Sequence, residues 1–122
     1  MNNPVNWFEI ATNDLERAKE FYAKVFLRDF ELIEMPDTKM YMFSGGPDLP
    51  GAAGALVHSP DNKPHAEGTI IYFECEDVAT EFSRVEAAGG QVVLPKMSIG
   101  EFGFIAMFID TEGNKIGMHS NQ

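Results

Sequence analysis

The stretch Trp7-Phe8-Glu9-Ile10-Ala11 carries the pattern from which the fold of this chain can be worked out. Its alternation predicts a strand with Phe8 and Ile10 on one face and Trp7, Glu9 and Ala11 on the other. Phe8-Glu9 recurs as Phe73-Glu74, about 65 positions further on. Two more dipeptides recur at similar distances, Met42-Phe43 as Met107-Phe108 and His58-Ser59 as His119-Ser120. The chain is therefore predicted to contain the same structural unit twice.

Each copy of the pattern indicates a strand, an amphipathic helix and three further strands. In the first copy Asn13 and Asp14 offer an N-cap, and the apolar residues that follow keep to one helical face. In the second copy Asp77 begins the helix and Gly89-Gly90 ends it. The expected strands span residues 5–11, 30–34, 39–44, 52–58, 69–75, 91–94, 103–109 and 115–119.

This order predicts an α+β fold of two tandem βαβββ modules in a single domain, residues 1–122. Module one spans residues 1–58, a linker rich in proline and polar residues spans 59–68, and module two spans 69–122. We expect one cupped, mostly antiparallel mixed sheet with both helices packed outside it. Because successive residues of a strand point to opposite faces, the core face is expected to carry Phe8, Ile10, Ile71, Phe73, Ile116 and Met118. The cup face carries Trp7, Glu9, Ile70, Tyr72, Glu74, Gly117 and His119.

The composition limits the kinds of partner that the chain can bind. Nine basic against 19 acidic residues give a net charge of −10, which repels nucleic-acid phosphates and anionic lipid surfaces. No stretch approaches the ~20 apolar residues of a membrane span, and the N-terminus lacks a basic region followed by an apolar block. We therefore expect a cytoplasmic protein with no nucleic acid and no membrane partner. The single cysteine, Cys75, excludes an intramolecular disulfide and is expected to be a small buried hydrophobe.

Three motifs together resemble a known superfamily over the whole chain. They are Trp7-Phe8-Glu9-Ile10 leading into Asp14-Leu15-Glu16-Arg17-Ala18, the run Val85-Glu86-Ala87-Ala88-Gly89-Gly90, and an Asp-x-x-Gly-Asn turn at residues 110–114 before the last strand. The chain resembles the vicinal oxygen chelate superfamily, which includes glyoxalase I, bleomycin-resistance and extradiol dioxygenase proteins. The resemblance implies paired βαβββ modules and a homodimer, for which Met40 and Met42 are candidate interface residues.

The resemblance also says where a metal would be bound. Enzymes of this superfamily hold a divalent metal with His, Glu or Gln from the first and last strands of each module, and the metal stabilises charge that develops on the substrate. Carried over to this sequence, the four positions are Trp7, Leu56, Ile70 and Gly117, and none can bind a hard or borderline cation. This departure implies no metal and no cofactor, and it speaks against glyoxalase I chemistry and iron-dependent ring cleavage. Whether the chain is an enzyme stays open.

Three functions remain as hypotheses. The leading one is a protein that binds a small apolar or aromatic molecule in the cup without metal. The second is a metal-dependent lyase or dioxygenase-type enzyme with relocated ligands, for which Glu9, Glu74 and His119 are the candidates. The third is an interaction module with no ligand, whose cup is filled by its own side chains. For the leading hypothesis the expected lining is Trp7, Glu9, Tyr72, Glu74, Phe102 and His119.

Overall fold

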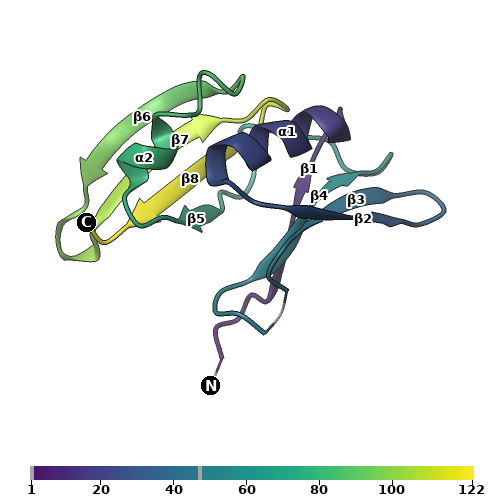
Figure 1. The fold of residues 1–122 in the computed structure, drawn as a ribbon, viewed down its shortest axis with the longest axis horizontal. Helices are drawn as coiled ribbons and strands as arrows, with labels where there is room; N and C mark the ends of the chain where they lie inside the picture. The colour runs from purple at the N-terminus through teal and green to yellow at the C-terminus, as the bar shows by residue number, and fades with distance from the viewer. Residues whose placement is uncertain (1, 47) are drawn as a thin grey trace.

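The computed structural model describes residues 2–46 and 48–122 and contains two sheets of four strands each. In module one the strand order is β1-β4-β3-β2, and in module two it is β5-β8-β7-β6 (Figure 1). The first and last strands of each module, β1 with β4 and β5 with β8, pair in parallel. All other neighbouring strands are antiparallel. The predicted fold class, α+β with two βαβββ modules, is confirmed. The elements are β1 (Trp7–Ala11), α1 (Leu15–Phe26), β2 (Phe30–Glu34), β3 (Lys39–Phe43), β4 (Ala53–His58), β5 (Tyr72–Glu74), α2 (Val78–Phe82), β6 (Gln91–Ser98), the short 3-10 helix η1 (Gly100–Phe102), β7 (Phe104–Ile109) and β8 (Lys115–Ser120).

Helix α1 begins where the sequence predicts it. Asp14 is the N-cap, and its carboxylate accepts a hydrogen bond from the backbone N–H of Arg17 at 3.0 Å. Ala18, Phe21, Tyr22 and Val25 form the buried stripe of the helix, at the spacing that keeps one face apolar. The helix is therefore held by a polar cap at one end and by burial of one face along its length.

Several boundaries in module two differ from the predicted ones. The first strand begins at Tyr72 rather than Thr69, and helix α2 ends at Phe82, with turns continuing to Gly89. Strand β6 is longer than expected, because β-bulges between its pairs with β7 let it continue to Ser98. Module two is thus the same unit as module one, with a shorter first strand and a shorter helix.

Helix α1 packs between the two sheets, contrary to the expectation that both helices would pack outside one common sheet, and α2 packs against the sheet of module two. Helix α1 contacts both sheets: the Tyr22 ring lies 5.9 Å from that of Phe43 on β3, and the Phe26 ring stacks 4.3 Å from that of Phe73 on β5. Figure 1 shows α1 between the two sheets, which open away from each other below it. One core cluster contains residues of both sheets and both helices, including Cys75, buried as predicted. The reason is that both amphipathic helices can bury their apolar faces in one shared core.

The turn between β7 and β8 joins the two modules. The Glu112 carboxylate accepts hydrogen bonds from the backbone N–H groups of Asn13 and Asp14, at 2.8 and 2.7 Å, just before α1. Asn114 donates from Nδ2 to the backbone oxygen of Ala11 at 2.8 Å, and Asp110 accepts a 2.7 Å hydrogen bond from the Tyr22 hydroxyl. The Asp-x-x-Gly-Asn turn is therefore a structural link between module two and the start of α1.

No helix within residues 2–46 and 48–122 has the length and apolar character needed to cross a membrane.

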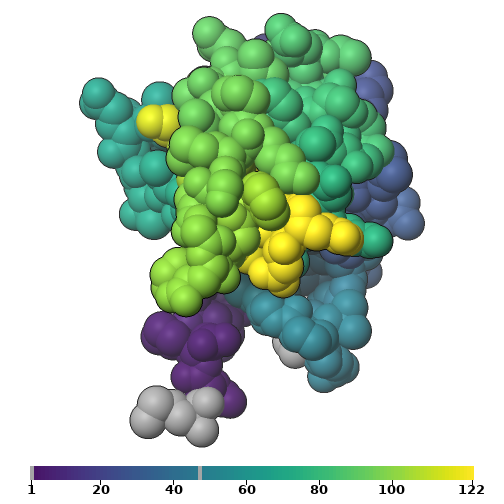
Figure 2. Space-filling model, turned by 90° about the vertical axis from the view of Figure 1, so that its left-hand side faces the viewer, coloured from purple at the N-terminus to yellow at the C-terminus, as the bar shows by residue number. Residues whose placement is uncertain are grey.

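Figure 2, which faces the left-hand side of Figure 1, shows the green β6 region over the yellow C-terminal segment. The purple N-terminal residues and the blue-teal connection between β3 and β4 protrude below this region.

Candidate functional site

Each sheet has one side turned away from the shared core, which we call its outer face. In module one the outer face carries Trp7 and Glu9 of β1, which pair in register with Ala53 and Ala55 of β4. The Trp7 indole N–H donates a 3.2 Å hydrogen bond to the Glu9 carboxylate, so the two side chains lie together as their spacing predicts. The indole is only partly covered, with 38% of the residue exposed.

The remainder of the outer face of module one is filled by its own side chains. Met40 of β3 packs with Ala55 and Val57 of β4, and all three are buried, at 7%, 0% and 3% exposure. Ile33 of β2 and Met42 of β3, both partly buried, pack against this cluster. Met40 is thus covered within its own chain and offers little of the exposed apolar surface expected for an interface, while Met42 stays half-buried.

The outer face of module two is built around Tyr72 and Gly117, which lie opposite each other on β5 and β8. A Cβ atom added at Gly117 would lie 2.5 Å from the Tyr72 ring, so the ring lies directly against the glycine backbone. Half of Tyr72 remains exposed, at 51%. The pair therefore leaves an aromatic surface open to solvent at a position where any larger residue on β8 would push the ring away.

Beside this pair, the His119 imidazole is hydrogen-bonded through both nitrogens. Nδ1 lies 2.8 Å from the Glu74 carboxylate, and Nε2 lies 2.6 Å from the backbone oxygen of Phe102 in η1. Both partners are acceptors, and only the protonated ring can donate to both at once. The hydrogen bond to Glu74, and then the one to Phe102, accordingly raises the pKa of His119 above its ordinary value.

The structure divides the six residues expected to line one cup into two groups. Tyr72, Glu74, Phe102 and His119 meet on module two, where Phe102 contributes its backbone oxygen and its side chain is 70% exposed. Trp7 and Glu9 lie on the outer face of the other sheet, across the core. Within one chain the six residues lie on two surfaces, because the core faces of both sheets meet around α1 and the outer faces point away from it, and their role as the lining of a ligand site stays a prediction.

The structure shows where the four positions carried over from the resemblance lie. Leu56 is fully buried in the shared core, since the residues of β4 that share a side with Trp7 and Glu9 are Ala53, Ala55 and Val57. Ile70 precedes β5, and the residue opposite Gly117 is Tyr72. Trp7 and Gly117 are therefore on the outer faces of their sheets, and Leu56 is not.

Sequence reasoning missed the residues of β7 that complete the outer face of module two. Ile105 pairs with His119 and Met107 pairs with Gly117, and both are half-buried on the same side as Tyr72. The signal was present in the strand Phe104–Ile109, because its alternate residues must point to opposite faces. These two side chains give the surface beside Tyr72 an apolar floor.

A family comparison identifies the group of proteins to which this architecture belongs. The sequence model described as "Glyoxalase/Bleomycin resistance protein/Dioxygenase superfamily" matches residues 5–118. The chain belongs to this superfamily. The resemblance inferred from the motifs at residues 7–18, 85–90 and 110–114 is confirmed at this level.

Individual relatives within the superfamily are distant. The chain is 25% identical over 118 residues to the anthracycline biosynthesis protein DnrV of Streptomyces peucetius, covering 88% of this chain but 43% of that protein. A mutant glyoxalase I from Zea mays superposes with a TM-score of 0.76 at 19% identity, covering 97% of this chain and 46% of that one. TnmS3, an antibiotic binding protein from Streptomyces sp. CB03234, superposes with a TM-score of 0.68 at 24% identity, covering 99% and 98%. The chain thus spans less than half the length of DnrV, and the two structural matches establish the fold.

The residues of this superfamily member do not fit the metal that its enzymes use. Leu56, Ile70 and Gly117 have no donor atom in their side chains, and the Tyr72 ring lies against Gly117. His119 is the one imidazole on either outer face among the described residues, and both its nitrogens already face acceptors. No group of three His, Cys, Asp or Glu side chains in residues 2–46 and 48–122 is placed to hold a metal ion, so Glu9, Glu74 and His119 do not form a site within one chain.

Proposed function

We propose that this superfamily member binds a small apolar or aromatic molecule without metal, on the outer face of module two. The observation that carries the proposal is the Tyr72–Gly117 pair. The superfamily resemblance places a metal-binding side chain at position 117, and this chain has a glycine there with a half-exposed aromatic ring against it. An aromatic surface suits stacking of a planar molecule, which is worth about 0.5–1.5 kcal/mol beyond area burial.

The surroundings of Tyr72 support the same proposal. Ile105 and Met107 provide apolar contact, and a methionine adapts its shape to different ligands. The His119 ring, held by Glu74 and Phe102, adds a fixed polar edge beside the ring of Tyr72. A surface with apolar contacts and a small number of oriented polar groups is the usual composition of a small-molecule site.

Similar proteins also support a role in binding a small molecule. The superfamily description includes bleomycin resistance proteins, and TnmS3 is described as an antibiotic binding protein of nearly the same length. At 24% identity this match supports the fold, and the ligand of TnmS3 is not transferred to this chain. What we carry over is the class of activity, which is binding without a required chemical step.

The first test is metal content. Elemental analysis of gently purified protein, run beside thermal unfolding with Mn, Fe, Ni and Zn, is expected to give neither stoichiometric metal nor a rise in melting temperature. One metal per chain with a matching rise would overturn the metal-independent part of the proposal and favour the enzyme with relocated ligands.

The second test locates the binding surface with 1-naphthol as the probe. In ¹H–¹⁵N NMR titrations we expect the amides of Glu74, Gly117 and His119 to shift saturably, and Tyr72→Ala to weaken binding about five- to tenfold. Leu32→Ala is the matched control, since Leu32 is an exposed apolar residue of the other module, at 47%. Equal loss in both variants, or no binding at all, would contradict this location and favour the interaction module.

Cytoplasmic location and homodimer formation remain proposals from the sequence. Light scattering of the purified chain tests the second of these. A mass near twice 13.6 kDa supports a homodimer, and a mass near 13.6 kDa contradicts it.

A further inference from the structure

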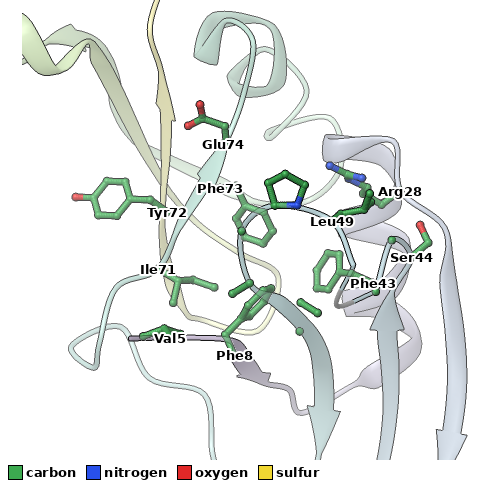
Figure 3. Close-up of a pocket in the computed structure, with 17 residues that line it drawn as sticks. Val5, Phe8, Arg28, Phe43, Ser44, Leu49, Ile71, Tyr72, Phe73 and Glu74 are labelled. Atoms are coloured by element: carbon green, nitrogen blue, oxygen red, sulfur yellow. The ribbon is translucent and has the colours of Figure 1, made fainter. Parts of the chain in front are cut away.

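A cavity of about 420 Å³ lies between the two modules, on the core side of β5 and away from the outer faces (Figure 3). Module one contributes Phe8, Phe43, Arg28 and part of the connection before β4, and module two contributes the run from Ile71 to Glu74. In Figure 3 the side chains of Tyr72 and Glu74 point away from the phenylalanine rings, toward the outer face. The phenylalanine side of the cavity thus lies across β5 from the surface around Gly117, although Tyr72 and Glu74 of β5 are also among the residues that line it.

The cavity has an aromatic floor of three rings that contact each other. Phe8 lies 5.7 Å from Phe43 and 6.0 Å from Phe73, and Phe43 lies 5.7 Å from Phe73, measured between ring centroids. The rings meet at angles of 48°, 84° and 51°, so both edges and faces are presented. A planar ring placed on this floor would find the offset or edge-to-face contacts that aromatic groups prefer.

A single cation lies on the wall of the cavity. Arg28 is exposed and follows the C-terminal end of α1, and Figure 3 shows its guanidinium at the rim beside Leu49. No hydrogen bond or ion pair involving Arg28 is formed among residues 2–46 and 48–122. The other charged lining residue, Glu74, directs its carboxylate to His119 at 2.8 Å. The guanidinium is therefore available to a ligand, and its planar set of donors matches a carboxylate or sulfonate.

We propose that this cavity is a second binding site, for an aromatic anion of one or two rings whose acid group pairs with Arg28. The volume lies in the range of small-molecule pockets. The net charge of −10 opposes general binding of anions, so an anion held here depends on local pairing with Arg28 and on the phenylalanine floor.

The experiment compares two fluorescent probes that share their rings and differ in charge. 8-Anilinonaphthalene-1-sulfonate carries a sulfonate, and N-phenyl-1-naphthylamine has the same rings without it. We expect Arg28→Gln to weaken binding of the sulfonate about tenfold and to change binding of the neutral probe less than twofold. Lys63→Gln, the same charge change at an exposed linker residue, is the matched control and should affect neither probe.

Two further variants distinguish this site from the surface proposed above. Ala52→Trp, at an exposed lining residue before β4, should fill the cavity and prevent binding of both probes, while Met107→Ala, on the outer face of module two and outside the cavity lining, should leave the sulfonate bound. If Ala52→Trp does not fold, NMR shifts of Phe8, Gly54 and Ile71 amides in the unmodified chain report the same location. Equal effects of Arg28→Gln on both probes, shifts confined to other residues, or loss of the sulfonate in Met107→Ala would overturn the proposal. None of these results depends on whether 1-naphthol binds at Tyr72.

Discussion

The connections that precede β4 and β8 occupy the same place in the two modules and are built in opposite ways. In module two, residues 110–114 form a short turn whose side chains are hydrogen-bonded into the other module. In module one the connection is longer, and its described residues, 44–46 and 48–52, are mostly exposed and include much of the lining of the cavity. Among the described residues, the backbone N–H of Ser44 bonded to the oxygen of Asp29 at 3.0 Å is its one hydrogen bond outside the strands.

This difference indicates that the two copies of the repeated unit can serve different purposes. The connection in module two is bonded to the other module, and the connection in module one lines a cavity. The Glu112 side chain is fully buried and accepts hydrogen bonds from Thr111, from Arg17 and from two backbone N–H groups at the start of α1. Burial opposes its ionisation most strongly, but the hydrogen bonds from Arg17, Asp14, Thr111 and Asn13 together lower the pKa of Glu112. A connection made this way cannot change shape freely, whereas the one in module one has no comparable restraint and is available to form a cavity wall.

The largest expected effect comes from removing the buried carboxylate of that turn. Glu112→Ala leaves two backbone N–H groups and the half-exposed Arg17 guanidinium without their partner, and we expect a loss of about 2–4 kcal/mol in the free energy of unfolding. Urea unfolding followed by circular dichroism measures it. Glu101→Ala, at an exposed carboxylate of η1, is the control and should change stability by less than about 0.5 kcal/mol. Similar values for the two variants would show that the turn does not hold the modules together.

A second comparison concerns Gly54 on β4 and Gly117 on β8, the last strands of the two modules. Each of these glycines lies against an aromatic ring. A Cβ at Gly54 would lie 2.4 Å from the ring of Phe8, which packs against Phe43 and Phe73 and cannot move away. Gly54→Ala should therefore cost about 1–3 kcal/mol. Gly117→Ala should cost less, because the half-exposed ring of Tyr72 can rotate into solvent. Thermal unfolding of both variants measures the order, and a larger loss at Gly117 would mean that Tyr72 is held more firmly than its exposure indicates.

A matched pair of turn glycines gives a smaller effect. Gly113 has φ +95° and Gly51 has φ +87°, and an added Cβ at either would meet open space. The cost of alanine is therefore backbone strain alone, about 1–2 kcal/mol where the conformation is held. We expect that cost for Gly113→Ala and less for Gly51→Ala, since the connection before β4 has fewer restraints on its conformation. Equal losses in chemical denaturation would remove this distinction between the connections.

The smallest expected effect is a pH dependence of stability. It follows from the residues that lie opposite Glu74 on β5 and Glu9 on β1, the first strands of the two modules. Glu74 pairs with His119 on β8, whereas Glu9 pairs with Ala55 on β4. Because the pKa of His119 is raised, its contribution to stability is complete below its ordinary value of about 6.5 and is lost as pH rises through the raised value.

NMR titration of His119 should show this raised pKa, and Glu74→Gln should bring it back toward the ordinary value. Glu9→Gln is the control and should leave the titration unchanged. A His119 pKa at or below the ordinary value in the unmodified chain would contradict the hydrogen-bonded arrangement with Glu74 and Phe102.

The sequence by itself determined the local elements and their order. The alternation of Trp7 to Ala11, the cap at Asp14 and the apolar stripe of α1 are properties of neighbouring residues, and the structure confirms them. The pairing of Glu74 and His119 on one face also follows from alternation along two adjacent strands. The predicted division into residues 1–58, 59–68 and 69–122 is a statement about the sequence pattern and stays a prediction.

Only the tertiary structure decided which faces meet and which residues lie opposite each other. A strand has a period of two, so a sequence match can slip by one or two residues without any local penalty. This is why Leu56, a position carried over from the resemblance, lies in the core, and why His58 and His119 are not equivalent despite the repeated dipeptide: the partner of Glu9 is Ala55. The position of α1 between the sheets, and with it the cavity floored by Phe8, Phe43 and Phe73, depends on contacts between residues far apart in the chain, which no local pattern records.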